Sequence, residues 1–225
     1  MSASTLSAKL KYQLNYHCLG QAALQAVRAQ DHYKMWRGRA AAGALNPLQS
    51  LVEAKHLLSR HYLEGRYANG VKRVAWVTSG APSEILRALG FYLIYPENHA
   101  AICGARKMST DIVEHAEFAQ YSRDICSYAR TDIGALLSGK NAVGKLPTPD
   151  LLVCCTNICQ TVLYWYKQLA AYFNVPLFVI DTPFLYDSWQ PHQLDYVKKQ
   201  LELLIQTAEK IAGKSMQPAA FEQVM

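Results

Sequence analysis

Short apolar runs and longer amphipathic stretches alternate along the chain from Gly70 onward. The runs VKRVAWVTS, FYLIYPENH, PDLLVCCTN and VPLFVIDTPF predict strands, because they are rich in β-branched and aromatic residues and are bounded by turn residues. The second run is expected to end as a strand at Pro96. Strands that alternate with helices in this way predict a parallel sheet covered by helices on both faces.

Apolar residues at spacings near three, four and seven predict amphipathic helices for the remaining segments. These helices are expected over residues 4–38, 47–65, 83–90, 109–125, 126–139, 158–173 and 193–212. Residues 4–38 form one or two helices, and Pro47 suits the first turn of the next. The break between the two central helices is placed near Tyr121 to Asp124, and the tail after Gly213 has no pattern that predicts an element.

The predicted fold class is therefore α/β, with a helical N-terminal arm followed by a doubly wound parallel-sheet domain of the Rossmann or flavodoxin-like kind. We expect the arm to span residues 1–67 and the α/β domain residues 68–190. A C-terminal helix and tail would occupy residues 191–225.

Composition and charge exclude several classes of protein. The chain has 225 residues, 51% of them hydrophobic, which is enough to bury a large core. Its formal charge of +6 comes from scattered Lys and Arg residues, which argues against a nucleic-acid-binding protein. No apolar run is long enough to span a membrane, and the first residues do not resemble a signal peptide. We therefore expect a cytoplasmic protein whose six cysteines are thiols or metal ligands.

Three cysteines, Cys154, Cys155 and Cys159, crowd around the carboxyl end of a predicted strand, where α/β folds place active sites. If the next helix begins by Thr156 or Asn157, the sulfurs of Cys155 and Cys159 would share one side of its first turn. The positive end of that helix favours thiolate, the form that binds iron or zinc. Alternatively, these cysteines are small buried hydrophobic residues. The spacings typical of zinc sites, dithiol redox pairs and bacterial ferredoxin clusters are absent.

Cys126, in SRDICSYAR, is the natural distant partner of this group. Ser122 or Asp124 is expected to cap the following helix, and the charges of Arg123 and Arg130 would stabilise a thiolate or an anionic ligand. Ordinary packing remains the alternative for this cysteine.

Two further motifs bear on the chemistry. In YPENH, Glu97 follows a predicted strand and could act as an acid–base or positioning group, although a solvated turn starting at Pro96 explains the same residues. GKNAVGKL resembles a phosphate-binding loop, but Leu146 stands where Ser or Thr is required and prolines follow, so we expect an ordinary flexible loop.

Read in order, the blocks APSEILRALGFYLIYPENHAAICGARK, YSRDICSYARTDIG and PDLLVCCTNICQTVLYWYKQLAAYFNVPLFVIDTPF resemble the subunits of the 2-hydroxyacyl-CoA dehydratase and benzoyl-CoA reductase family. The resemblance spans roughly residues 70–212. It implies a 4Fe–4S cluster held by three widely spaced cysteines, with the fourth iron position open to water, hydroxide or substrate.

Matched block by block, Cys126 takes the place of the first ligand and Cys159 that of the second, which leaves Cys154 and Cys155 as neighbours. Cys103, in ICGARK, would be a supporting thiol. In the family the third cysteine lies in a second α/β domain toward the carboxyl end. This chain has no matching cysteine, so we expect a fragment of a longer subunit, an incomplete cluster, or a substitute ligand in Cys155 or Cys103.

The resemblance also implies the reaction. A 2-hydroxyacyl-CoA would lose water by a ketyl-radical mechanism, after one electron arrives from an ATP-dependent iron–sulfur activator protein. Glu97 would be a polar participant near the acyl-CoA substrate, and a related second subunit would complete a heterodimer. The alternatives are a benzoyl-CoA reductase subunit, which reduces an aromatic ring, and a non-catalytic α/β scaffold protein.

Overall fold

The computed structural model describes residues 3–40 and 49–225, which fall into two compact units. The first unit combines the described part of residues 1–71 with residues 143–147, and the second comprises residues 72–142 and 148–225. The helices and strands are α1 (Ala3–Tyr12), the π-helix η1 (Gln13–Cys18), α2 (Leu19–Ala40), α3 (Gln49–Gly65), β1 (Val74–Val77), α4 (Ser83–Ala88), β2 (Tyr92–Ile94), α5 (Pro96–Ala105), α6 (Ser109–Phe118), α7 (Ser127–Ser138), β3 (Leu151–Cys155), α8 (Gln160–Phe173), β4 (Leu177–Ile180), α9 (Pro191–Ala212) and α10 (Pro218–Glu222).

The first unit is helical, as the sequence predicts. The hydroxyls of Tyr12 and Tyr16 donate hydrogen bonds to the Glu64 carboxylate at 2.8 and 3.1 Å, which ties the N-terminal helices to α3. The segment that resembles a phosphate-binding loop is irregular, and within the first unit Arg66 donates to its Val143 carbonyl. The expected start of a helix at Pro47 lies outside the described residues.

The second unit is built on a four-stranded, all-parallel sheet in the order β2-β1-β3-β4. In the register of the sheet, Ala75 pairs with Leu93 on one side and with Leu151 on the other, and Leu152 pairs with Leu177. The predicted α/β fold class and its helical N-terminal arm are confirmed.

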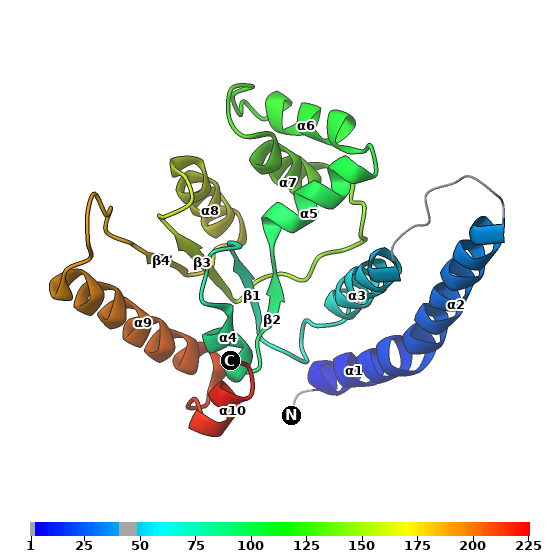
Figure 1. Cartoon of the computed structure of the whole chain (residues 1–225), viewed down its shortest axis with the longest axis horizontal. Helices are drawn as coiled ribbons and strands as arrows, with labels where there is room; N and C mark the ends of the chain where they lie inside the picture. Colours follow the sequence, from blue (N-terminus) through cyan, green and yellow to red (C-terminus); the bar gives the residue numbers. More distant parts are fainter. Residues whose placement is uncertain (1–2, 41–48) are drawn as a thin grey trace. The chain divides into compact units, whose positions relative to one another are not determined.

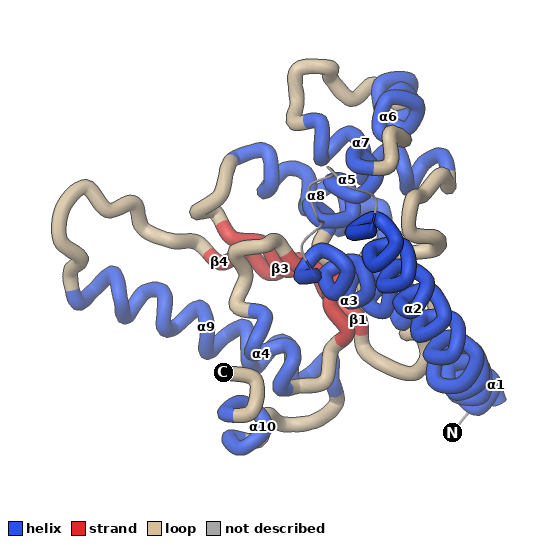
Figure 2. The backbone as a smooth tube through the Cα atoms, turned by 45° about the vertical axis from the view of Figure 1, so that its right-hand side comes forward, coloured by secondary structure: helices blue, strands red, loops and turns tan. Residues whose placement is uncertain are grey.

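Helices lie on both faces of this sheet (Figures 1 and 2). Ala75 and Val77 belong to a buried cluster that includes Leu86 of α4 and Leu204 of α9. On the other face, the Trp76 ring lies 5.1 Å from the ring of Phe173, at the end of α8. Both faces are therefore covered, as a parallel sheet requires.

Three sequence expectations are wrong in detail. The strand β2 ends at Ile94, and Pro96 begins helix α5, because proline suits the first turn of a helix and lacks only a donor that is unpaired there anyway. The helix expected over residues 109–125 already ends at Phe118. The tail contains a short helix, α10, that also begins with a proline. No helix in the described ranges is long and apolar enough to cross a membrane.

Candidate functional site

Cys126 and Cys159 occupy equivalent places in the fold. Each is the residue that caps the N-terminus of a helix, Cys126 before α7 and Cys159 before α8. Both side chains are exposed. Thiols at such positions face unpaired backbone N–H groups and the positive end of the helix dipole, which favour a negatively charged ligand atom.

The local environment of Cys126 differs from the prediction. The Ser122 hydroxyl accepts the backbone N–H of Asp124 at 3.2 Å, and Cys126 itself is the cap residue. The guanidinium groups of Arg123 and Arg130 both pair with Glu117, at 2.8 and 2.6 Å. Their charges are thus directed to a carboxylate of α6. That they also support the thiol stays a prediction.

The three crowded cysteines are also separated by the fold. Helix α8 begins only at Gln160, so Cys155 is the last residue of β3 and does not share a helical turn with Cys159. Cys154 and Cys155 are buried. Burial raises the pKa of Cys154 to about 12 and also raises the pKa of Cys155, so both side chains remain protonated thiols at neutral pH.

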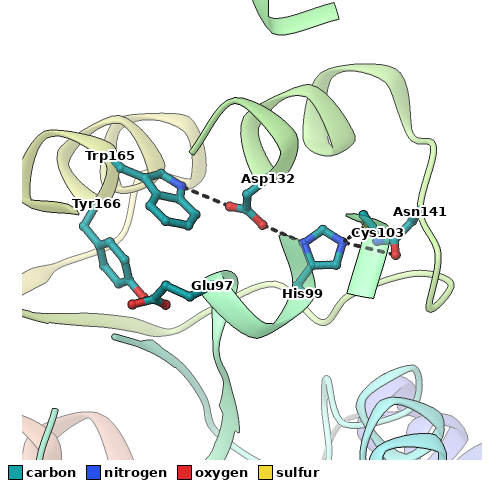
Figure 3. Close-up of polar contacts among 7 residues, drawn as sticks. All are labelled: Glu97, His99, Cys103, Asp132, Asn141, Trp165 and Tyr166. Atoms are coloured by element: carbon teal, nitrogen blue, oxygen red, sulfur yellow. Dashed lines mark hydrogen bonds and ion pairs between the residues drawn. The ribbon is translucent and has the colours of Figure 1, made fainter. Parts of the chain in front are cut away.

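Glu97 lies in the first turn of α5, next to the carboxyl end of β1. One carboxylate oxygen accepts the backbone N–H of Ser79 at 3.2 Å, and the other accepts the hydroxyl of Tyr166 at 3.5 Å. Figure 3 shows the Glu97 carboxylate beside the Tyr166 ring. Burial raises the pKa of Glu97 above its usual value. A solvated turn, which was the alternative interpretation, is excluded because Glu97 is half-buried in a helix.

A buried polar network behind these residues was missed in the sequence (Figure 3). The Asp132 carboxylate contacts Nδ1 of His99 at 2.7 Å and accepts the indole N–H of Trp165 at 3.1 Å. Nε2 of His99 lies 3.2 Å from the amide oxygen of Asn141 and 3.5 Å from the sulfur of Cys103. The network joins α5, α7 and α8, and His99, Asp132 and Cys103 are fully buried.

The charges in this network stabilise one another. Burial alone would lower the pKa of His99, but its contact with the Asp132 carboxylate outweighs burial and raises the pKa to about 10. Burial likewise opposes ionisation of Cys103, but the hydrogen bond and the positive charge of His99 lower the pKa of the Cys103 thiol overall. Cys103 is therefore engaged with His99 in the core, away from the exposed thiols of Cys126 and Cys159.

A groove of about 380 Å³ runs between α7 and α8, close to the two capping cysteines. It is lined by Gln120, Tyr121, Ser122, Ile125, Ala129, Ile133, Gln160, Thr161, Tyr164, Trp165 and Gln168. Ile125 precedes Cys126 and Gln160 follows Cys159, so the groove reaches both helix N-termini. Its lining carries no charged side chain and is mostly apolar, with a few polar groups, as is typical of small-molecule sites.

Within residues 3–40 and 49–225, no three His, Cys, Asp or Glu side chains are grouped so that they could hold a metal ion.

Residues 78–225 match the family described as "2-hydroxyglutaryl-CoA dehydratase, D-component". The chain is 40% identical over 170 residues to the (R)-2-hydroxyisocaproyl-CoA dehydratase alpha subunit of Clostridioides difficile, in an alignment that covers 72% of this chain and 42% of that protein. It is 35% identical to the (R)-phenyllactyl-CoA dehydratase alpha subunit of Clostridium sporogenes, in an alignment that covers 68% of this chain and 38% of that protein.

A benzoyl-CoA reductase subunit of Thauera aromatica is 31% identical over 170 residues, covering 73% of this chain and 39% of the relative. The chain thus spans less than half the length of these relatives.

Proposed function

The chain belongs to the 2-hydroxyglutaryl-CoA dehydratase D-component family, and on that premise we propose that it is a subunit of an iron–sulfur 2-hydroxyacyl-CoA dehydratase, which removes water from a 2-hydroxyacyl thioester. The observation that carries the proposal is the placement of Cys126 and Cys159. They are two exposed thiols at the N-termini of two helices on the carboxyl edge of a parallel sheet.

The donor set fits a 4Fe–4S cluster in part. Cysteine thiolates are the usual ligands of such clusters, and Cys126 and Cys159 would supply two. Cys154, Cys155 and Cys103 are buried. The family resemblance implies that a third ligand would come from the part of the relatives' length that this chain does not span.

A bound cluster would supply a Lewis acid for a substrate oxygen and a path for one electron, which a ketyl-radical route needs because the β-proton of a 2-hydroxyacyl thioester is not acidic. The chain's own residues would bind and orient the substrate. Glu97, with its raised pKa, would hold or deliver a proton at one carboxylate oxygen. Tyr166 and the Ser79 N–H keep that carboxylate in place.

The groove between α7 and α8 would receive the acyl part of the thioester. Because its lining has no cationic side chain, an apolar acyl group suits it better than one ending in a carboxylate. The relatives named for isocaproyl and phenyllactyl thioesters support this substrate class.

The partners proposed are a related second subunit and an ATP-dependent iron–sulfur activator. The names of the relatives, which are alpha subunits, support the first of these. The identity of 40% to the 2-hydroxyisocaproyl-CoA dehydratase subunit, against 31% to the benzoyl-CoA reductase subunit, favours dehydration over aromatic ring reduction.

Anaerobic reconstitution with iron and sulfide tests the proposal, on a chain extended over the part of the relatives' length that these residues do not span. We expect Cys126→Ser and Cys159→Ser each to lose most of the bound iron and visible absorbance, while Cys18→Ser, which changes an exposed thiol of the other unit, keeps both. Glu97→Gln should keep the iron but slow thioester turnover by about 100-fold or more. An extended wild-type chain without iron would overturn the proposal, and full iron content in both cysteine variants would refute the ligand assignment.

A further inference from the structure

Helices α7 and α8 run parallel to each other. Asp132 of α7 bonds Trp165 of α8, and further along both helices the Leu136 carbonyl accepts the Tyr172 hydroxyl at 3.5 Å. Because both partners advance toward the C-terminal ends together, the helices point the same way. Their N-termini, with Cys126 and Cys159, therefore lie at the same end of the pair.

The Asp132–Trp165 hydrogen bond sets these N-termini level to within about one helical turn, since the Leu136–Tyr172 bond is offset by three residues (136 − 126 = 10, 172 − 159 = 13). Asp132 lies six residues after Cys126, and Trp165 lies six residues after Cys159 (132 − 126 = 165 − 159 = 6). With a rise of 1.5 Å per residue, the bond stands about 9 Å along the axis from either cap. Sliding one helix by a turn would move its cysteine by about 5 Å relative to the other.

Asp132 is held from two sides, which makes it suited to fix this register. Its Oδ1 contacts the buried ring of His99 on α5, and its Oδ2 accepts the indole N–H of Trp165 on α8 (Figure 3). All three side chains are at most 3% exposed. A buried carboxylate that loses either partner is left with an unpaired charge, so alternative registers are costly. Apolar contacts alone would tolerate a shift more readily.

We propose that Asp132 is a positioning residue: by bonding Trp165 and His99 it holds α7 and α8 in the register that keeps Cys126 and Cys159 together at one end of the pair, where two thiols could bind one metal centre. The identity of the metal centre rests on the function proposed above, whereas the register of the two helices does not. The test therefore measures the register and metal binding separately.

The first readout is the distance between the two thiols. In a Cys18→Ser background, spin labels react with the exposed Cys126 and Cys159, because the other three cysteines are buried. Pulsed dipolar spectroscopy should give one narrow distance distribution. Trp165→Phe, which keeps a ring but removes the indole donor, and Asp132→Asn should each broaden or shift it.

Trp36→Phe, at an exposed tryptophan of α2, is the matched control and should leave the distribution unchanged. Far-UV circular dichroism and urea unfolding establish that each variant is folded. If Asp132→Asn does not fold, Trp165→Phe still decides. A distribution as narrow and at the same distance in folded Trp165→Phe would overturn the proposal.

The second readout is binding of Cd²⁺, a thiolate-seeking probe, to the unlabelled protein. Trp165→Phe should raise the apparent dissociation constant at least tenfold while both thiols still react with a thiol reagent. If the distances respond but reconstitution yields no iron, the proposed function fails and the positioning role stands. If iron binds normally and neither the distances nor Cd²⁺ affinity responds, the positioning role fails alone.

Discussion

His99 is the residue whose chemistry depends most on the fold. In the chain it stands 33 positions before Asp132 and 42 before Asn141, and only the packing of α5 against α7 brings them together. Sequence patterns report periodicity along one element and are insensitive to contacts across such separations. The spacing of four between His99 and Cys103 was the one local signal, since it places both on one face of α5.

The raised pKa of His99 predicts a specific pH dependence of stability. The pKa of His99 is about 10 in the folded protein and about 6.5 in an unfolded chain. The contribution of protonated His99 to folding stability is therefore fully present below about pH 6.5. It falls as the pH rises and is lost above about pH 10. One extra proton bound by the folded state corresponds to a slope of about −1.4 kcal/mol per pH unit.

The lowered pKa of Cys103 makes stability change with pH in the opposite direction, so the comparison is made in a Cys103→Ser background. Urea unfolding between pH 7 and pH 10 measures the free energy of unfolding of this background protein and of the same protein with His99→Gln. The difference between the two free energies should change with pH by the slope given above. Parallel stability profiles would contradict the assignment of a protonated His99 in the core.

Cys126 and Cys159, by contrast, were chosen from local sequence and family resemblance, and their role as ligands stays a prediction. What sequence reasoning missed was their surroundings. The Arg123 and Arg130 side chains are attracted to Glu117, and competition between a carboxylate and a thiol for a guanidinium group cannot be judged without knowing that α6 packs beside α7.

Among the elements, the close crossing of α6 and α7 depends on one glycine. A Cβ atom added at Gly134 would overlap the carbonyl oxygen of Ile112, so the two helix backbones touch at this point. Ile112 and Ala135 are buried in a cluster with Cys103, so this crossing supports the α5 side of the polar network.

Gly134→Ala should therefore destabilise the protein by about 1–3 kcal/mol, because the α6 backbone cannot yield as a flexible side chain would. Gly104→Ala is the matched control: it is also a helical glycine, and the nearest atom to its added Cβ, the Ser109 Oγ, lies at 3.6 Å. The stability of this control variant should be unchanged, or higher by about 0.5–1 kcal/mol because alanine has the better helix propensity. Chemical denaturation measures both, and equal stabilities of the two variants would contradict the tight crossing.

The strands and long helices were predictable because their patterns repeat within the element, as in the apolar run of β3 and the amphipathic face of α9. Helix α5 was not predictable, because Pro96 and the polar residues after it are equally typical of a turn. Its identity as a helix depends on burying Ala100 and Cys103 against other segments, which is a tertiary effect.

At the scale of the whole molecule, the parallel sheet explains how residues far apart in sequence come to the same edge. β1 and β3 are neighbours in the sheet although more than 70 residues separate them. Ser79, just after β1, donates to the Glu97 carboxylate, and Cys159 follows β3. The class of fold was predictable from alternation, whereas the strand order β2-β1-β3-β4 is a property of pairing between strands.

The second unit should be able to fold without the first. Its main buried cluster draws on β1, β3, β4, α4 and α9, all within residues 72–225. A chain of these residues is expected to show one cooperative urea transition, with Cys126 and Cys159 as reactive toward thiol reagents as in the longer chain. Leu204→Ala in this shorter chain should lower its stability by about 2–5 kcal/mol, because Leu204 is fully buried in the cluster. A gradual transition that Leu204→Ala does not move would mean that residues 1–71 are needed to form the sheet's core.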